Sequence, residues 1–141
     1  TAQLAEMLIK YQQPIIGVEV VPEHKIKDYG IIDGTLIEDR VYQIQNIIEK
    51  PSPEEAPSNI GAMGRYVLTS EIFEILEHTA PGRKGEIQLT DALSKYTDYL
   101  GVIAKSTRYD IGDIDTWIVS NLKLLMMDER YRNLVVKTMH L

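Results

Sequence analysis

VYQIQNIIEKP, residues 41–51, is the stretch that decides the fold. Its first eight residues are rich in β-branched side chains, which predicts a buried strand. Pro51 has no N–H group to donate, so the strand must end there. It therefore ends by placing a carboxylate, Glu49, beside an ammonium, Lys50, on a rigid support. Taken alone, the two charges are better explained as an ordinary surface ion pair.

The residues before this stretch predict a β-hairpin. Two β-rich runs, residues 30–37 and 41–48, are separated by Glu38-Asp39-Arg40, a length typical of a hairpin connection. Asp33-Gly34 lies inside the first run and predicts either a bulge or an earlier turn. The two runs would form an antiparallel part of a larger sheet.

The rest of the chain alternates between helical and strand patterns. Apolar residues recur at helical spacing in some segments, and short apolar runs bounded by proline or glycine occur in others. The predicted helices are residues 2–12, a helix between Ser70 and Pro81, a short helix carrying Ala92, Leu93 and Tyr96, and residues 116–127 and 129–138. The other predicted strands are residues 15–21, 60–68 and 99–104, with a short continuation at 108–111. This pattern indicates one α/β domain over residues 1–141, a mixed sheet with an inserted antiparallel hairpin, flanked by helices.

Composition excludes several classes of function. With 15 Lys+Arg against 21 Asp+Glu, the net charge is −6, which argues against non-specific nucleic-acid binding. The chain has no cysteine, so disulfides and thiolate metal sites are excluded and the cytoplasm is the expected setting. No apolar run approaches the roughly 20 residues of a membrane span, so no membrane partner is expected.

The end of the 41–51 strand indicates what kind of ligand would bind there. A carboxylate such as Glu49 accepts hydrogen bonds from sugar hydroxyls, and a compact ammonium such as Lys50 suits a phosphate. A ligand held by both has hydroxyls at one end and a phosphate at the other, which describes a sugar 1-phosphate. Gly30 would let such a ligand approach bare backbone, although a turn glycine explains it equally well.

Two further stretches offer polar groups. NIGAMG, residues 59–64, could expose an amide and backbone beside the same strand, or could be a strand start softened by glycine. In EIQLTD, residues 86–91, Glu86 could contact a ligand. Thr90 or Asp91 is better explained as the cap of the helix that follows.

Two aspartates flank a glycine turn in YDIGD, residues 109–113. Asp113 is predicted to cap the following helix. Asp110 follows a strand, and ligands of α/β proteins bind at strand ends, so it is a candidate ligand of Mg²⁺. One carboxylate makes a poor Mg²⁺ site unless phosphates and another carboxylate assist.

Five stretches in order resemble a known family. They are YGIID at 29–33, IIEKP at 47–51, SNIGAMGRYVL at 58–68, GEIQLTDAL at 85–93 and RYDIGD at 108–113. The ordered set resembles the sugar-1-phosphate nucleotidylyltransferases, and among them the bacterial UTP–glucose-1-phosphate uridylyltransferases. The resemblance spans nearly the whole chain and is least clear over its last ten or so residues.

The resemblance implies a role for each candidate residue. Gly30 would contact glucose by its backbone, Glu49 would hold glucose hydroxyls, and Lys50 would bind the sugar phosphate. Ala62 would line the sugar pocket by its backbone, with Asn59 nearby. Asp110 matches the position that binds Mg²⁺ in related thymidylyltransferases. The expected small-molecule partners are glucose 1-phosphate, UTP and UDP-glucose.

The chain also departs from the family pattern. The glycine-rich loop that cradles the nucleoside triphosphate in the family, and an aspartate that binds Mg²⁺ there, have no counterpart in this sequence. We therefore expect the C-terminal, sugar-binding part of a Rossmann-like nucleotide-diphospho-sugar transferase fold, inactive alone. Surfaces that would pack against the rest of the transferase fold should then be uncovered, which favours a homo-oligomer. Exchange of helices or strands between chains is one way to form it. Open alternatives are a dTTP-type sugar-1-phosphate nucleotidylyltransferase and a non-catalytic sugar-nucleotide-binding domain.

Overall fold

The computed structural model describes residues 2–82, 85–109 and 111–138. It divides the chain into two compact units, Thr1–Lys105 and Ser106–Leu141, where the sequence indicated one domain. Asp110, the candidate metal ligand, lies outside the described residues. None of the helices in the described ranges is long and apolar enough to cross a membrane.

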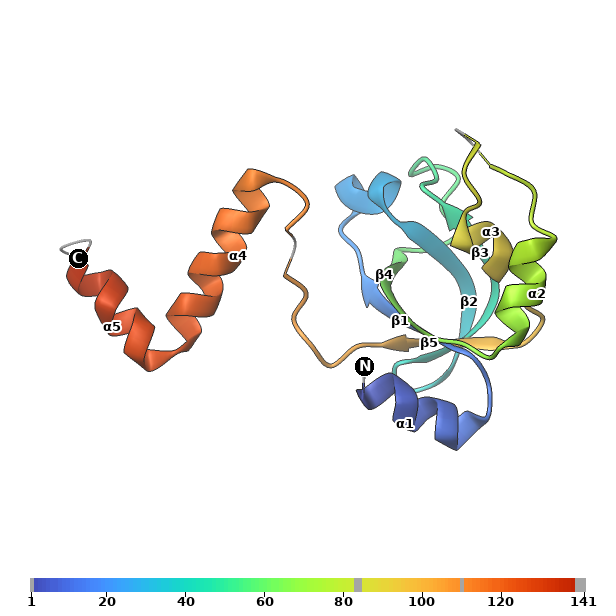
Figure 1. The fold of residues 1–141 in the computed structure, drawn as a ribbon, viewed down its shortest axis with the longest axis horizontal. Coiled ribbons are helices and arrows are strands. Elements are labelled where there is room, and N and C mark those ends of the chain that lie inside the picture. Colours follow the sequence, from blue (N-terminus) through green and yellow to red (C-terminus); the bar gives the residue numbers. More distant parts are fainter. Residues whose placement is uncertain (1, 83–84, 110, 139–141) are drawn as a thin grey trace. The chain divides into compact units, whose positions relative to one another are not determined.

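The first unit is built on five strands whose sheet closes on itself. They are β1 (Ile15–Val20), β2 (Gly30–Glu38), β3 (Val41–Glu49), β4 (Ile60–Val67) and β5 (Tyr99–Ile103). The strand order is β1-β4-β2-β3-β5, and β5 pairs back onto β1, so the strands surround a common interior (Figure 1). The β1–β5 pair is parallel and the other pairs are antiparallel. The mixed sheet and its hairpin agree with the sequence analysis, whereas the closure was not anticipated.

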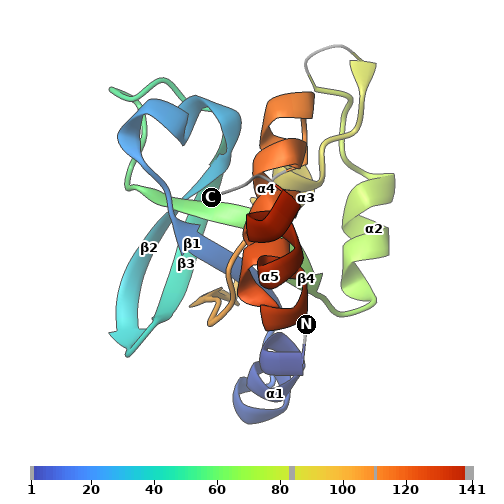
Figure 2. The ribbon, with the colours of Figure 1, turned by 90° about the vertical axis from the view of Figure 1, so that its left-hand side faces the viewer.

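The β2–β3 hairpin explains how so few strands can close. Asp39-Arg40 connects the strands, with Arg40 at a positive φ of 63°. Between Asp33 and Gly34 the pairing register skips Gln45 of β3, so a bulge lies here with its extra residue on β3, and the alternative of an earlier turn is wrong. A β-carbon on Gly34 would lie 2.9 Å from the Gln43 carbonyl oxygen, so only glycine fits there. Bulges increase strand twist, and Figure 2 shows β2 and β3 as a long twisted ribbon.

Three helices and one 3₁₀ segment surround the sheet: α1 (Ala2–Tyr11), η1 (Glu23–Asp28), α2 (Glu71–Glu77) and α3 (Leu89–Leu93). One core cluster joins the strands to α2 and α3 through side chains such as Ile32, Ile72 and Leu93. A second cluster lies under α1, where Leu4 packs with residues of β1, β3 and β5. The first cluster fixes α3 beside β3, near the strand end where the candidate site lies.

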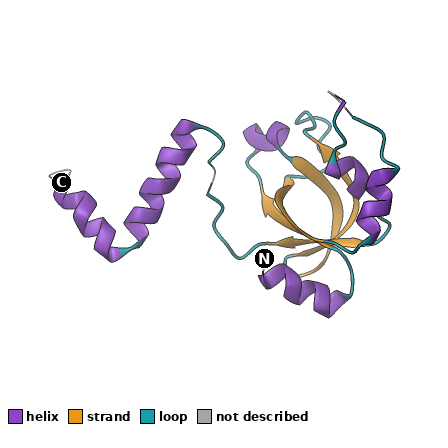
Figure 3. Ribbon diagram, in the orientation of Figure 1, coloured by secondary structure: helices purple, strands orange, loops and turns teal. Residues whose placement is uncertain are grey.

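The second unit consists of two helices, α4 (Ile114–Met127) and α5 (Glu129–Thr138), drawn in purple in Figure 3. The predicted cap is confirmed, because the Asp113 carboxylate accepts the Thr116 N–H at 2.8 Å and a capping box forms. The helix therefore begins two residues before the predicted start at Thr116. The predicted strand continuation at 108–111 is wrong for its described residues, none of which is in a strand.

Much of the α4 surface is apolar and exposed. The exposed apolar side chains include Ile114, Trp117, Ile118, Val119, Leu122, Leu124 and Met127. A helix that is apolar on most sides is normally buried against other protein. Within its own unit, α4 therefore carries more apolar surface than α5 covers, and the expectation of uncovered faces in the whole chain stays a prediction.

Candidate functional site

Pairing of β2 with β3 brings Gly30 and Glu49 together. The two residues lie directly opposite each other in the register. A β-carbon on Gly30 would lie only 3.2 Å from Glu49 Oε2, so the absence of a side chain makes room for the carboxylate. The Lys50 N–H continues the pairing by donating to the Tyr29 carbonyl at 2.9 Å. The strand end thus holds the Glu49 carboxylate against the backbone of Gly30. A carboxylate that binds hydroxyl groups needs such a fixed position.

Lys50 adopts an unusual backbone conformation at this strand end. Its φ is 47°, in the left-handed region that side-chain-bearing residues rarely adopt. Such a conformation persists only where surrounding contacts impose it, and it is common at functional sites. The Lys50 Nζ lies 3.9 Å from Glu49 Oε1, and its side chain is 62% exposed. The ion pair is therefore loose and contributes little to stability, and the ammonium can reach an incoming anion.

Thr90 is the functional candidate that sequence reasoning missed. Its Cγ2 lies 3.2 Å from the β-carbon position of Gly30, so it borders the same space as the Glu49 carboxylate. The side chain is nearly buried, yet its hydroxyl has no hydrogen-bond partner among the described residues. A buried hydroxyl without a partner costs free energy, so its position calls for an explanation. The methyl group, and not the hydroxyl, faces Gly30, so the side chain would have to rotate before a ligand in that space could supply the missing partner.

The prediction that Thr90 or Asp91 caps a helix is wrong. The N-cap of α3 is Gln88, with no side-chain cap bond, and Thr90 lies inside the helix. A Thr-Asp pair before apolar residues resembles a cap in sequence, and only packing against β2 and β3 shows that Thr90 faces inward. Glu86 is exposed, and its carboxylate accepts a weak hydrogen bond from Gln88 at 3.4 Å. Its contact with a ligand stays a prediction.

Asn59 and Ala62 lie at the start of the strand next to β2. Gly61 of β4 pairs with Ile31 of β2, and the Asn59 carbonyl accepts the Val21 N–H at 2.8 Å. The Asn59 side chain is exposed, and Ala62 packs against the barrel core. Within the described ranges, no hydrogen bond joins either residue to Glu49 or Lys50. Their contact with a sugar therefore stays a prediction.

The described residues do not by themselves form a metal site. Nowhere in the described ranges do three or more His, Asp or Glu side chains gather as a metal-binding group. Mg²⁺ in nucleotide enzymes is usually held by one or two carboxylates together with substrate phosphates. The proposed ligand Asp110 lies outside the described residues, so Mg²⁺ binding also stays a prediction.

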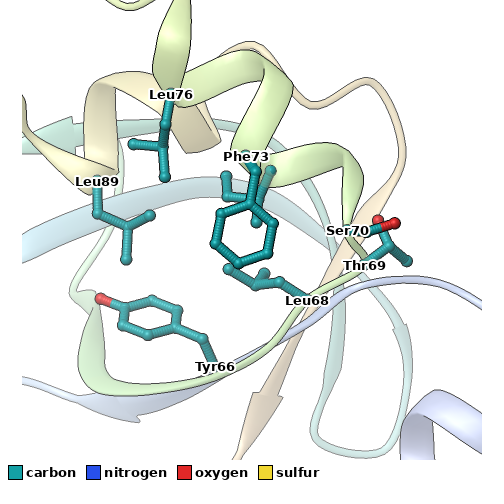
Figure 4. Close-up of a pocket in the computed structure, with 8 residues that line it drawn as sticks. Tyr66, Leu68, Thr69, Ser70, Phe73, Leu76 and Leu89 are labelled. Atoms are coloured by element: carbon teal, nitrogen blue, oxygen red, sulfur yellow. The ribbon is translucent and has the colours of Figure 1, made fainter.

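An apolar pocket of about 480 Å³ lies between the end of β4 and helices α2 and α3. It is lined by Tyr66, Leu68, Thr69, Ser70, Ile72, Phe73, Leu76 and Leu89. Figure 4 shows side chains of both helices pointing toward Tyr66 and Leu68. None of the lining residues is charged, so this pocket is unsuited to a phosphate and differs in chemistry from the Glu49–Lys50 strand end.

Tyr66 links the pocket to the charged strand end. Burial raises the pKa of the Tyr66 phenol, and the negative charge of Glu49 raises that pKa further. Tyr99, a fully buried tyrosine, has a pKa raised to about 12 by burial alone. The Glu49 carboxylate is thus close enough to Tyr66 to disfavour the phenolate.

The chain was compared with known proteins. The model of the nucleotidyl transferase family matches residues 2–126. This chain belongs to the nucleotidyl transferase family. Its curated relatives in that family include the UTP–glucose-1-phosphate uridylyltransferases of Bacillus subtilis, 41% identical over 99% of this chain, and of Pseudomonas aeruginosa, 40% identical over 82% of it. The chain covers 50% and 43% of these two proteins, so it spans about half of their length or less.

Solved structures of nucleotidyl transferases agree with this membership. A UDP-glucose pyrophosphorylase complexed with UDP-glucose has a TM-score of 0.84 and 39% identity, with 89% of this chain and 49% of that one covered. A UTP-bound UGPase from Acinetobacter baumannii has a TM-score of 0.79 and 28% identity, with 96% and 49% covered. The mixed α/β fold is therefore shared with UDP-glucose pyrophosphorylases.

The pKa of Tyr66 tests whether the negative charge of Glu49 lies near its phenol. We expect Glu49→Gln to lower the pKa of Tyr66, because a phenolate forms more readily when a neighbouring negative charge is removed. The measurement is a pH titration of tyrosine ¹³Cζ resonances by NMR. The pKa of Tyr99 is the internal control and should not move. An unchanged Tyr66 pKa would show that the carboxylate does not lie near the phenol.

Proposed function

We propose that this chain is the sugar-phosphate-binding part of a UTP–glucose-1-phosphate uridylyltransferase, which converts UTP and glucose 1-phosphate into UDP-glucose and pyrophosphate. The observation that carries the proposal is the β2–β3 strand end, where Glu49 lies over Gly30 and Lys50 follows in a left-handed conformation. The names of the uridylyltransferase relatives support the choice of reaction.

Each residue of the strand end has a chemical task in this proposal. Glu49 accepts hydrogen bonds from glucose hydroxyls that approach the backbone of Gly30. The Thr90 methyl group borders the same space, and rotation of that side chain would bring its hydroxyl to a sugar hydroxyl bound there. Lys50 holds the phosphate with its ammonium. Hydroxyl recognition and phosphate recognition are thus placed on adjacent residues of one strand, which fixes the orientation of the sugar phosphate.

The reaction needs little covalent chemistry from the protein. A phosphate oxygen of glucose 1-phosphate attacks the α-phosphorus of UTP, and pyrophosphate leaves. Because the attacking oxygen is already anionic, no general base is required, and catalysis consists of positioning and charge neutralisation. Lys50 orients the attacking phosphate. Mg²⁺, when bound, would neutralise phosphate charge, but the described residues do not form its site and no step here depends on it.

The remaining expectations about the whole enzyme stay predictions. They are that this part lies in the C-terminal half of the enzyme, that the complete fold is Rossmann-like, that Asp110 binds Mg²⁺, and that the protein is cytoplasmic. Association of the isolated chain into a homo-oligomer also stays a prediction. Light scattering should give a mass at least twice that of one chain, and a monodisperse monomer would contradict this expectation.

The task of Lys50 is tested by titrating the chain calorimetrically with UDP-glucose, with and without Mg²⁺. We expect Lys50→Ala to weaken binding about tenfold or more, because a charge-assisted hydrogen bond to phosphate contributes about 1.5–3 kcal/mol. Lys50→Arg should restore binding only in part, since a planar guanidinium differs in geometry from a compact ammonium.

Lys123→Ala serves as the matched control, because Lys123 is an exposed lysine of α4 in the other unit. It removes the same charge from the chain without touching the strand end, and it should leave the affinity unchanged. Equal affinities of the wild type and Lys50→Ala would overturn the assignment of Lys50. Absence of binding by a folded wild-type chain would contradict a preformed sugar-phosphate site.

Replacement of Thr90 is expected to affect stability and ligand binding in opposite directions. Thr90→Val replaces a buried hydroxyl that has no partner among the described residues with a methyl of similar size. We expect an unchanged or raised melting temperature, because the desolvation cost of the hydroxyl disappears, and weaker UDP-glucose binding by about fivefold. Calorimetry and thermal melting measure the two effects. Lower stability with unchanged affinity would show that the hydroxyl serves the fold instead.

A further inference from the structure

The last hydrogen bond of the β2–β3 ladder holds Lys50. Gly30 pairs with Glu49, and one position further out the Lys50 N–H donates to the Tyr29 carbonyl at 2.9 Å. The Tyr29 N–H is used elsewhere, because it donates to the Ile26 carbonyl at 3.1 Å. Among the described residues, one backbone bond therefore ties Lys50 to β2, and bonds at the end of a ladder are the first to open. The position of the Lys50 backbone thus depends on how firmly Tyr29 is held.

The Tyr29 side chain packs against the bare backbone of Gly61 in β4, the strand next to β2. A β-carbon on Gly61 would lie 3.0 Å from Tyr29 Cδ1 and 3.3 Å from Tyr29 Cβ, so the missing side chain is what lets the ring lie there. Gly61 pairs with Ile31, so the ring reaches from the start of β2 onto the neighbouring strand. The ring contact and the N–H bond to Ile26 together hold the carbonyl to which Lys50 is bonded.

The ring lies on the face of the sheet opposite the Glu49 carboxylate. Successive side chains of a strand point to opposite faces, so Tyr29 faces away from Gly30 and from Glu49, which pairs with Gly30. For the same reason, an extended Lys50 would share the face of the Tyr29 ring. Its φ of 47° instead brings its Nζ to 3.9 Å from Glu49 Oε1. The left-handed conformation therefore puts ammonium and carboxylate on one face, and it persists only where neighbouring contacts impose it.

We propose that Tyr29 is a positioning residue for Lys50. Its ring, packed against Gly61, keeps the Tyr29 carbonyl on the Lys50 N–H. The ammonium thereby stays on the face of the Glu49 carboxylate, where the sugar phosphate would bind. This inference rests on the proposed function for the identity of the ligand. The effect of the ring on the Lys50 backbone concerns the chain without ligand, and it can be tested separately.

The hairpin offers matched variants. Tyr29→Ala removes the ring, whereas Tyr29→Phe keeps the ring and removes only the hydroxyl. Tyr42 of β3, near the other end of the same hairpin, is a tyrosine of similar intermediate exposure. Tyr42→Ala therefore removes an equal ring from the hairpin without touching Tyr29 or Lys50.

NMR measures three quantities on each variant of the 141-residue chain. Without ligand, they are the exchange rate of the Lys50 amide with solvent and the Cα chemical shift of Lys50, which report its hydrogen bond and its backbone conformation. The third is the dissociation constant for glucose 1-phosphate. In the Tyr29 variants, the Leu100 N–H, which donates to the Pro14 carbonyl at 2.9 Å, is the reference for the stability of the barrel.

The ring-deleted variant should release Lys50 and leave the barrel folded. We expect Tyr29→Ala to speed exchange of the Lys50 amide about tenfold relative to that of Leu100, as when the net stabilisation of one hydrogen bond is lost. The Cα shift of Lys50 should move toward the value of extended backbone, and binding should weaken about fivefold. Tyr29→Phe and Tyr42→Ala should leave the exchange of the Lys50 amide, its Cα shift and the affinity unchanged.

The outcomes separate this inference from the proposed function. An unchanged exchange rate and Cα shift of Lys50 in a folded Tyr29→Ala variant would overturn the positioning task of Tyr29. An equal loss of affinity in Tyr29→Phe would also overturn it, because the hydroxyl and not the ring would then be responsible.

If the wild type does not bind glucose 1-phosphate, the proposed function fails, and the exchange rate and shift of Lys50 still decide whether the ring positions it. If Tyr29→Ala does not fold, Tyr29→Leu replaces it with the same expected changes, because leucine keeps apolar volume but has no flat ring to lie on Gly61.

Discussion

The candidate site depends on one backbone pairing, that of Gly30 on β2 with Glu49 on β3. The missing side chain of Gly30 leaves room for the Glu49 carboxylate, and the same space is bordered by the methyl group of Thr90. A side chain at position 30 would displace both neighbours. Antiparallel pairing also places the end of β3 beside the beginning of β2, so that Lys50 is held by the Tyr29 carbonyl. The charged groups of Glu49 and Lys50, the Thr90 side chain and the Gly30 backbone therefore lie together because of the register in which β2 and β3 pair.

Closure of the sheet supplies the remaining side of the site. The bulge at Gln45, opposite Asp33 and Gly34, increases the twist of the hairpin, and β5 pairs with both β3 and β1. The core cluster inside this barrel extends to α2 and α3, which anchors α3 beside β3. Thr90 lies on that short helix, with its hydroxyl buried and without a partner among the described residues. The Tyr99 hydroxyl is likewise buried without a partner among the described residues, so this cost is not confined to the candidate site.

Part of the fold and part of the candidate site could be predicted from sequence because the signals are local. Pro51 ends a β-branched run, so the position of Glu49 and Lys50 at a strand end followed from the chemistry of proline. Asp113 caps α4 because its side chain reaches an N–H only three residues away. Thr90 was misassigned for the converse reason: its sequence neighbours resemble a cap, and its actual surroundings come from residues of β2 and β3 that are distant in the chain.

From the sequence alone one could predict which residues are candidates for chemistry and where most helices and strands begin and end, since both depend on side-chain type and short-range spacing. It also carried the ordered motifs that resemble sugar-1-phosphate nucleotidylyltransferases. Closure of the sheet, and the position of the Thr90 methyl group beside Gly30 and Glu49, became visible in three dimensions alone. These features depend on strand register and on packing between segments far apart in the chain, and no local pattern records either of them.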